Sequence, residues 1–164
     1  MAVNTALIGE LQTEAAATRK VLERIPTEKF DWKPHEKSMT MKSLAAHVAN
    51  MFSWVAPTLE TAELDFAKGF EEPSPANTEE LLALFDENVA LAAAGLQRTD
   101  DETFMQNWTL RNGEEVYFTM PKIQVLRGMV FNHIVHHRGQ LSVYLRMNDI
   151  AVPGVYGPSA DEPM

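Results

Sequence analysis

The segment from Pro121 to about Met147 carries apolar side chains at steps of three and four residues. This spacing follows the 3.6-residue turn of an α-helix, so we expect these side chains to share one core-facing side. Proline suits the first turn of such a helix, where a backbone N–H has no intrahelical partner. The shared side consists of Ile123, Leu126, Val130, His133, Ile134, His137, Leu141 and Tyr144.

Three earlier segments show the same helical period. The first is stopped by Pro26, because proline cannot continue a helix. Pro57 in the second either kinks or ends that helix. Glu79 and Glu80 place carboxylates in the favourable first turn of the third. The segments run from about Thr5 to Ile25, from Ser38 or Thr40 to either Pro57 or about Leu64, and from Thr78 to between Gly95 and Thr99.

The connections between these segments indicate how the helices are joined. Residues 27–37 and Glu71–Asn77 contain proline and predict irregular connectors. Between Thr103 and Thr119 the period becomes that of strands, and Asn112-Gly113 predicts a tight hairpin turn. From about Asn148 the tail is expected to be irregular. The sequence thus predicts an all-α fold, with a short β-hairpin-like insertion before the last helix.

Length and composition limit the class of protein. The 164 residues suit one domain spanning positions 1–164. The chain has no cysteine, so a transition-metal site must use His, Asp, Glu and water. A net charge of −9 argues against a nucleic-acid partner and against docking on an anionic membrane. With no long apolar run and no signal-like N-terminus, we expect a cytoplasmic protein.

His133 and His137 are the strongest candidates for a metal site. Residues four apart lie above one another on a helix, with Cβ atoms about 6 Å apart, so both imidazoles can reach one ion. His136 points about 100° away from His137 and is not expected to join them. A metal site needs a third ligand, and His47 lies on the apolar side of the second helix. Core histidines satisfied by hydrogen bonds are the competing interpretation of all three candidate ligands.

Two amides follow the candidate ligands by three residues. Asn50 and Gln140 can hydrogen-bond a ligand imidazole or a bound molecule, although ordinary packing or surface roles explain them as well. No general base is assigned, because Glu10 and Glu14 are expected to be solvated carboxylates. The tryptophans Trp32, Trp54 and Trp108 either line a pocket above the metal or pack in the core.

The stretch His133-Ile134-Val135-His136-His137-Arg138-Gly139-Gln140-Leu141 resembles the C-terminal signature of the DinB superfamily of DinB- and YfiT-like metal-dependent enzymes. Leu44-Ala45-Ala46-His47-Val48 and Trp32-Lys33-Pro34 resemble earlier segments of that family, so the resemblance covers nearly the whole chain.

The resemblance implies an up-down-down-up four-helix bundle, often a homodimer. It implies that His47, His133 and His137 are metal ligands, for nickel or zinc. Arg138 and Gly139 then have structural roles, the glycine allowing close helix approach.

Three imidazoles leave a metal ion at least one open position. We therefore expect an enzyme acting on a small molecule, either by hydrolysis with metal-bound water or by thiol transfer with a metal-bound thiolate. A low-molecular-weight thiol is a possible partner in the second case. The alternative is a non-catalytic protein in which the metal is structural or supports a dimer.

Overall fold

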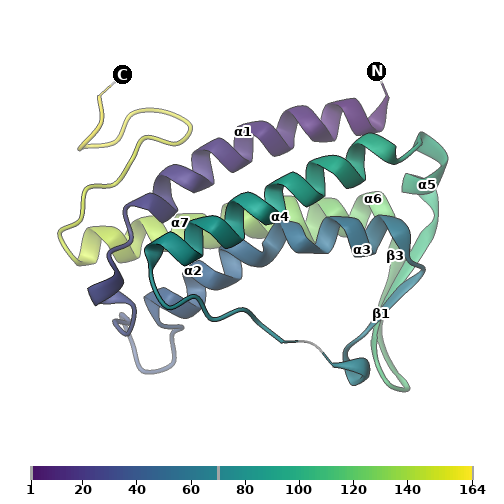
Figure 1. Cartoon of the computed structure of the whole chain (residues 1–164), viewed down its shortest axis with the longest axis horizontal. Coiled ribbons are helices and arrows are strands. Elements are labelled where there is room, and N and C mark those ends of the chain that lie inside the picture. Colours follow the sequence, from purple (N-terminus) through teal and green to yellow (C-terminus); the bar gives the residue numbers. More distant parts are fainter. Residues whose placement is uncertain (1, 70, 164) are drawn as a thin grey trace.

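The structure is a computed structural model that describes residues 2–69 and 71–163, and most of these are helical (Figure 1). In chain order the elements are α1 (Val3–Glu23), η1 (Thr27–Lys29), α2 (Met41–Asn50), η2 (Met51–Trp54), α3 (Val55–Glu60), β1 (Glu63–Asp65), η3 (Phe66–Lys68), α4 (Thr78–Arg98), α5 (Asp101–Met105), β2 (Asn107–Asn112), β3 (Glu115–Pro121), α6 (Lys122–Val125), η4 (Leu126–Phe131) and α7 (Asn132–Met147).

The long helical runs lie side by side along the length of the molecule (Figure 1). In that view α1 runs from right to left, α2 through α3 and then α4 both run from left to right, and α6 through α7 returns to the left. The parallel pair, α3 and α4, is joined by a long connection that holds β1 and the linker after it. Within the described residues, no helix has both the length and the apolar character needed to cross a membrane.

Side-chain caps fix where two of these helices begin. Thr40 Oγ1 accepts a hydrogen bond from the Ser43 backbone N–H at 3.1 Å, so α2 starts after Thr40 rather than Ser38. Asn77 Oδ1 accepts from the Glu80 N–H at 2.9 Å, and the Glu80 carboxylate accepts in return from the Ala76 N–H at 2.8 Å. Such reciprocal bonds satisfy N–H groups that have no partner inside the helix.

The second and last helical runs are continuous but change their winding. A 3-10 segment, η2, separates α2 from α3, and Pro57 lies inside α3, which ends at Glu60. The expected last helix begins at Lys122, with Pro121 as its N-cap, and contains the π-helical segment η4. π-Helical turns frequently occur at functional sites. Here the π segment ends two residues before His133.

A three-stranded sheet lies at one end of the helices, so the all-α prediction was too narrow (Figure 1). The expected hairpin is present: β2 and β3 pair antiparallel, and Gly113 in the turn has a φ of 61°. The strand β1, which was not predicted, pairs parallel with β2. Three residues are too few to show a period, which explains why β1 was missed.

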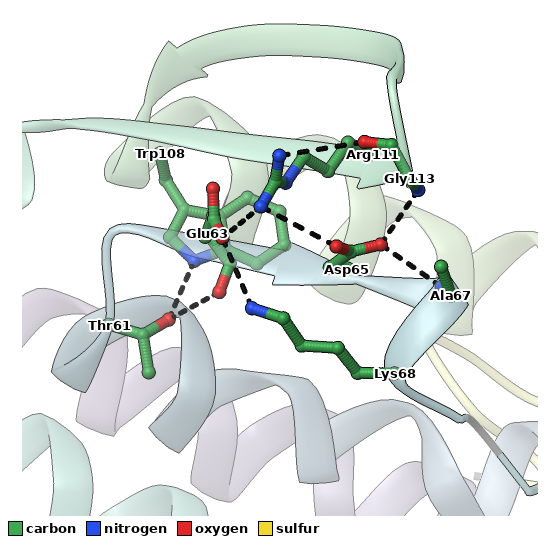
Figure 2. A network of polar contacts seen from close by, with 8 residues as sticks. All are labelled: Thr61, Glu63, Asp65, Ala67, Lys68, Trp108, Arg111 and Gly113. Carbon is green, nitrogen blue, oxygen red and sulfur yellow. Dashed lines mark hydrogen bonds and ion pairs between the residues drawn. The ribbon is translucent and has the colours of Figure 1, made fainter.

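Polar contacts tie β1 to the hairpin (Figure 2). Arg111 forms ion pairs with Glu63 at 2.7 Å and with Asp65 at 3.5 Å. Asp65 Oδ1 also accepts hydrogen bonds from the backbone N–H groups of Gly113 at 2.9 Å and Ala67 at 3.0 Å. The carboxylate of Asp65 therefore holds the hairpin turn against the connection between the helices.

The main core lies between the helical runs. Phe52 in η2 contacts Phe85 in α4 and Phe131 in η4, with ring centroids 6.0 and 5.9 Å apart. A smaller cluster of buried side chains, Trp108, Leu110 and Val125, joins the sheet to α6. The first cluster holds the helices that bear the candidate ligands, and the second fixes the sheet beside them.

Two structural expectations were wrong. Glu14 is buried rather than solvated, and it forms an ion pair with the buried Arg138 at 2.8 Å. Glu10 is half-buried and pairs with Arg127. Gly139 is exposed, and a Cβ atom added there would meet nothing within 4 Å, so this glycine does not mediate a close helix approach.

Candidate metal centre

The structure brings together His47 of α2 with His133 and His137 of α7. One ring nitrogen from each lies within 4.8 Å of the others, a spacing that can hold a metal ion. The ring centroids are 5.2 Å apart for His47 and His133, 4.9 Å for His47 and His137, and 4.6 Å for His133 and His137. We call these three residues the histidine triad. All three are half-buried.

Each triad imidazole has a hydrogen-bond acceptor at Nδ1. His47 Nδ1 lies 3.2 Å from Glu72 Oε1, and His133 Nδ1 lies 3.3 Å from the Met129 carbonyl oxygen. His137 Nδ1 lies 2.7 Å from Gln140 Oε1. Carboxylate and carbonyl oxygens only accept, so Nδ1 carries the proton in each ring. The three Nε2 atoms are then left as lone-pair donors, which is the form that binds a metal.

Exposed His136 fixes the orientation of the Gln140 amide. The Gln140 Nε2 group lies 3.1 Å from His136 Nε2, and an amide nitrogen can only donate. The amide oxygen must therefore face His137. His136 thus stays outside the triad, as the helical spacing predicts, and contacts it through Gln140.

Two lone pairs face each other inside the triad. His133 Nε2 and His137 Nε2 are 2.8 Å apart, although both rings carry their proton on the opposite nitrogen. Two such atoms repel unless a proton or a cation lies between them. The residues present therefore fit a metal ion, because the donor set is complete and the second nitrogen of each ring is already satisfied.

The surroundings favour the neutral form of two triad histidines. Burial lowers the pKa of His133 below its ordinary value of 6.5, and the nearby His47 lowers it further. Burial also lowers the pKa of His137, although the hydrogen bond that His137 donates to Gln140 opposes this shift, and His133 adds to the lowering. Neutral imidazole is the form that binds a metal ion, because no proton then occupies the nitrogen that coordinates the metal.

A cavity of about 250 Å³, the triad cavity, opens beside the histidines. Asn50 is in its wall, with its Oδ1 accepting a hydrogen bond from Asn88 Nδ2 at 3.4 Å. Trp54 also lines it, whereas Trp32 packs edge-on against Tyr144 and Trp108 is buried under the sheet. The lining residues are His47, Asn50, Met51, Trp54, Phe66, Glu72, Leu110, Met129 and His133.

Sequence reasoning missed Glu72. It lies in the linker before α4, and acidic residues in such linkers are common, so no local pattern marks it. Only the folded chain brings this carboxylate to His47 and into the cavity wall.

These features define a mostly helical protein in which three histidines are placed where they could hold a metal ion. The sequence matches the DinB family over residues 1–163, and the chain belongs to that family. The resemblance inferred from the motifs is thereby confirmed.

Three similar proteins match this chain over most of its length and most of their own. The chain is 27% identical over 155 residues to the uncharacterized protein YrdA of Bacillus subtilis, covering 91% of this chain and 85% of that one. A DinB-like protein from Bacillus cereus superposes with a TM-score of 0.72 at 20% identity, covering 94% and 98% of the two chains. The DinB-like protein YjoA from Bacillus subtilis also gives 0.72, at 19% identity, covering 92% and 97%. At these identities the two solved structures support the fold alone.

Proposed function

We propose that this protein is a metal-dependent enzyme acting on a small molecule, with His47, His133 and His137 as the metal ligands. One observation carries the proposal: one ring nitrogen from each of the three histidines lies within 4.8 Å of the others, beside a cavity large enough for a small ligand. Imidazole ligands suit nickel and zinc, which are the ions we expect. The helical runs would form the up-down-down-up four-helix bundle of the family.

The chain's own residues would prepare this chemistry. Glu72, the Met129 carbonyl and Gln140 accept hydrogen bonds from Nδ1 of the three imidazoles, which leaves each Nε2 available to bind a metal. The apolar part of the cavity wall, which includes Met51, Trp54 and Phe66, would limit the access of water. A bound divalent ion would supply Lewis acidity and would lower the pKa of a coordinated water or thiol. Hydrolysis and thiol transfer both follow from that property, and both remain within the proposal.

A structural metal is the second candidate, and the position of Glu72 favours it. Its carboxylate is half exposed and already lies 3.2 Å from His47 Nδ1, in the cavity wall. A rotation of this side chain could supply a fourth ligand and close the site. X-ray absorption spectroscopy of the metal-loaded protein separates the two. A closed shell of three imidazoles and one carboxylate would support the structural role, and an exchangeable fourth ligand supports the enzyme.

The ligand assignment is tested by substitution. We expect His137→Ala to lose stoichiometric nickel or zinc, as measured by elemental analysis of the purified protein. His35→Ala is the matched control, because its exposed imidazole lies in the connector before α2 and outside the triad. Full metal content in the His137→Ala protein would refute the site.

Thiol transfer has its own test. A low-molecular-weight thiol added to the cobalt- or nickel-loaded protein should produce a thiolate-to-metal absorption band. An unchanged spectrum over a range of thiols would contradict thiol transfer and leave hydrolysis as the proposed reaction.

We also propose that the protein is a homodimer. Sedimentation of the metal-loaded protein would test this oligomeric state.

A further inference from the structure

The wall of the triad cavity is divided between polar and apolar side chains. His47, His133, Asn50 and Glu72 supply the polar part. The remaining lining is apolar and consists of Met51, Trp54, Phe66, Leu110 and Met129. A molecule bound here would place its polar group at the triad and a hydrophobic portion against the other side chains.

The volume of the cavity limits the size of that portion. An apolar protein cavity of about 150 Å³ holds one benzene molecule, and pockets for drug-sized ligands span roughly 300–1,000 Å³. At about 250 Å³, the triad cavity has room for one ring with a short polar substituent.

The chemistry of the wall favours an aromatic ring. The rings of Trp54 and Phe66 meet edge-on, with centroids 6.1 Å apart and planes at 71°. Phe66 also meets the ring of Tyr117, with centroids 6.3 Å apart, and the ring of a ligand can extend such an aromatic cluster by stacking or by an edge contact. Met51 and Met129 bring thioether sulfurs, which also make favourable contacts with aromatic rings.

We propose that the triad cavity binds a small monocyclic aromatic molecule whose oxygen or sulfur donor points to the triad, and that Trp54 sets the size limit. This inference rests on the proposed function, because it places a metal ion at the triad. It adds the substrate class and one residue that determines specificity.

The role of Trp54 follows from a second cavity of about 160 Å³. This cavity is almost wholly apolar, and its walls are Ser53, Trp54, Pro57, Leu64 and Trp108. Trp54 lines both cavities, so the two spaces adjoin at this residue. Replacing Trp54 with alanine should join the two spaces and admit a longer molecule.

Hydroxamic acids that share one metal-binding group but differ in their hydrophobic portion test this proposal. The probes are acetohydroxamate, benzohydroxamate and 4-biphenylhydroxamate, titrated into the full-length cobalt-loaded protein and followed by its visible spectrum. We expect benzohydroxamate to bind about ten- to a hundredfold more tightly than acetohydroxamate, the range for burying one phenyl group. The biphenyl compound should bind more weakly than benzohydroxamate.

In Trp54→Ala we expect this preference to reverse, so that the biphenyl compound binds more tightly than benzohydroxamate. A gain of affinity for the longer probe cannot result from partial unfolding. The matched control is Trp32→Ala, because Trp32 packs against Tyr144 with ring centroids 5.4 Å apart and does not line the cavity. Its order of affinities should be that of the parent protein. If Trp54→Ala does not fold, Phe66→Ala should weaken benzohydroxamate and leave acetohydroxamate unchanged.

The outcomes separate this inference from the proposed function. Equal affinities for acetohydroxamate and benzohydroxamate, with a spectral response to both, would overturn the aromatic pocket and leave the open metal site standing. A cobalt spectrum that responds to none of the probes would overturn both. An unaltered order of affinities in a folded Trp54→Ala protein would overturn the size limit.

Discussion

Arg138 of α7 and Glu14 of α1 form an ion pair at 2.8 Å, with only 3% and 11% of their side chains exposed. Arg138 Nη1 also donates to Thr18 Oγ1 at 3.0 Å, and Tyr156 in the C-terminal tail donates to Glu14 Oε2 at 2.8 Å. The network joins α1, α7 and the tail. Because Arg138 directly follows His137, it also fixes the helix that carries two of the triad histidines.

We expect Arg138→Ala to lower the free energy of unfolding by about 3–5 kcal/mol, because it leaves the Glu14 carboxylate buried without its charge partner. Arg127→Ala is the control. This substitution breaks the ion pair between Arg127 and Glu10, whose side chains are 44% and 33% exposed, respectively. It should lower the free energy of unfolding by about 1 kcal/mol or less. Urea denaturation measures both. The network would have no special role if the two losses were equal.

The metal-free protein should lose stability as the pH falls below about 6.5. The folded state lowers the pKa of His133 and His137 from 6.5, mainly by burial, so the unfolded chain takes up protons first. The free energy of unfolding therefore falls as the pH drops through the window between 6.5 and the folded-state pKa values, and is regained above it. Urea melts from pH 7 to 5 measure this slope. It should be smaller in His133→Ala/His137→Ala, and an identical slope would contradict the prediction.

Asp65 gives a second pH dependence, at lower pH. The backbone N–H of Gly113 lowers the pKa of Asp65 below 3.8, with further lowering by the Ala67 N–H and by Arg111. Its stabilising effect is complete above 3.8 and is lost as the pH falls through the lowered pKa. Asp65→Asn should thus destabilise the protein at pH 7, with the difference shrinking near pH 3. Glu114→Gln is the matched control, because this exposed carboxylate lies beside Gly113 in the hairpin turn but accepts neither of the two backbone hydrogen bonds to Asp65. The same dependence on pH in both variants would contradict the prediction.

Gly139→Ala should stabilise the protein by about 0.5–1 kcal/mol. Glycine in the middle of a helix loses more backbone entropy than alanine, and nothing within 4 Å opposes an added Cβ. Gly113→Ala is the opposite case, because its φ of 61° strains any residue with a Cβ. Thermal melts of the two variants should shift in opposite directions. A loss of stability in Gly139→Ala would show that this glycine has a packing role that the structure does not contain.

The sequence alone determined the features that depend on local spacing. The step of four residues between His133 and His137 places both imidazoles on one side of α7, and this holds in any helix. The ends of the long helices follow from their apolar period together with caps and prolines, as Thr40 and Asn77 show. The hairpin turn follows from Asn112-Gly113, because glycine accepts the positive φ found there.

Only the tertiary structure decided which distant segments meet. His47 joins the pair on α7 because α2 packs beside it, and Glu72 reaches His47 from a linker that has no marking pattern. The burial of Glu14 depends on Arg138, which lies at the other end of the sequence. The triad cavity likewise needs η2, η3, β2 and η4 together. Helical and strand periods are visible in a sequence because they depend on neighbouring residues. Ion pairs and cavities are not visible there, because they depend on contacts between segments that lie far apart in the sequence.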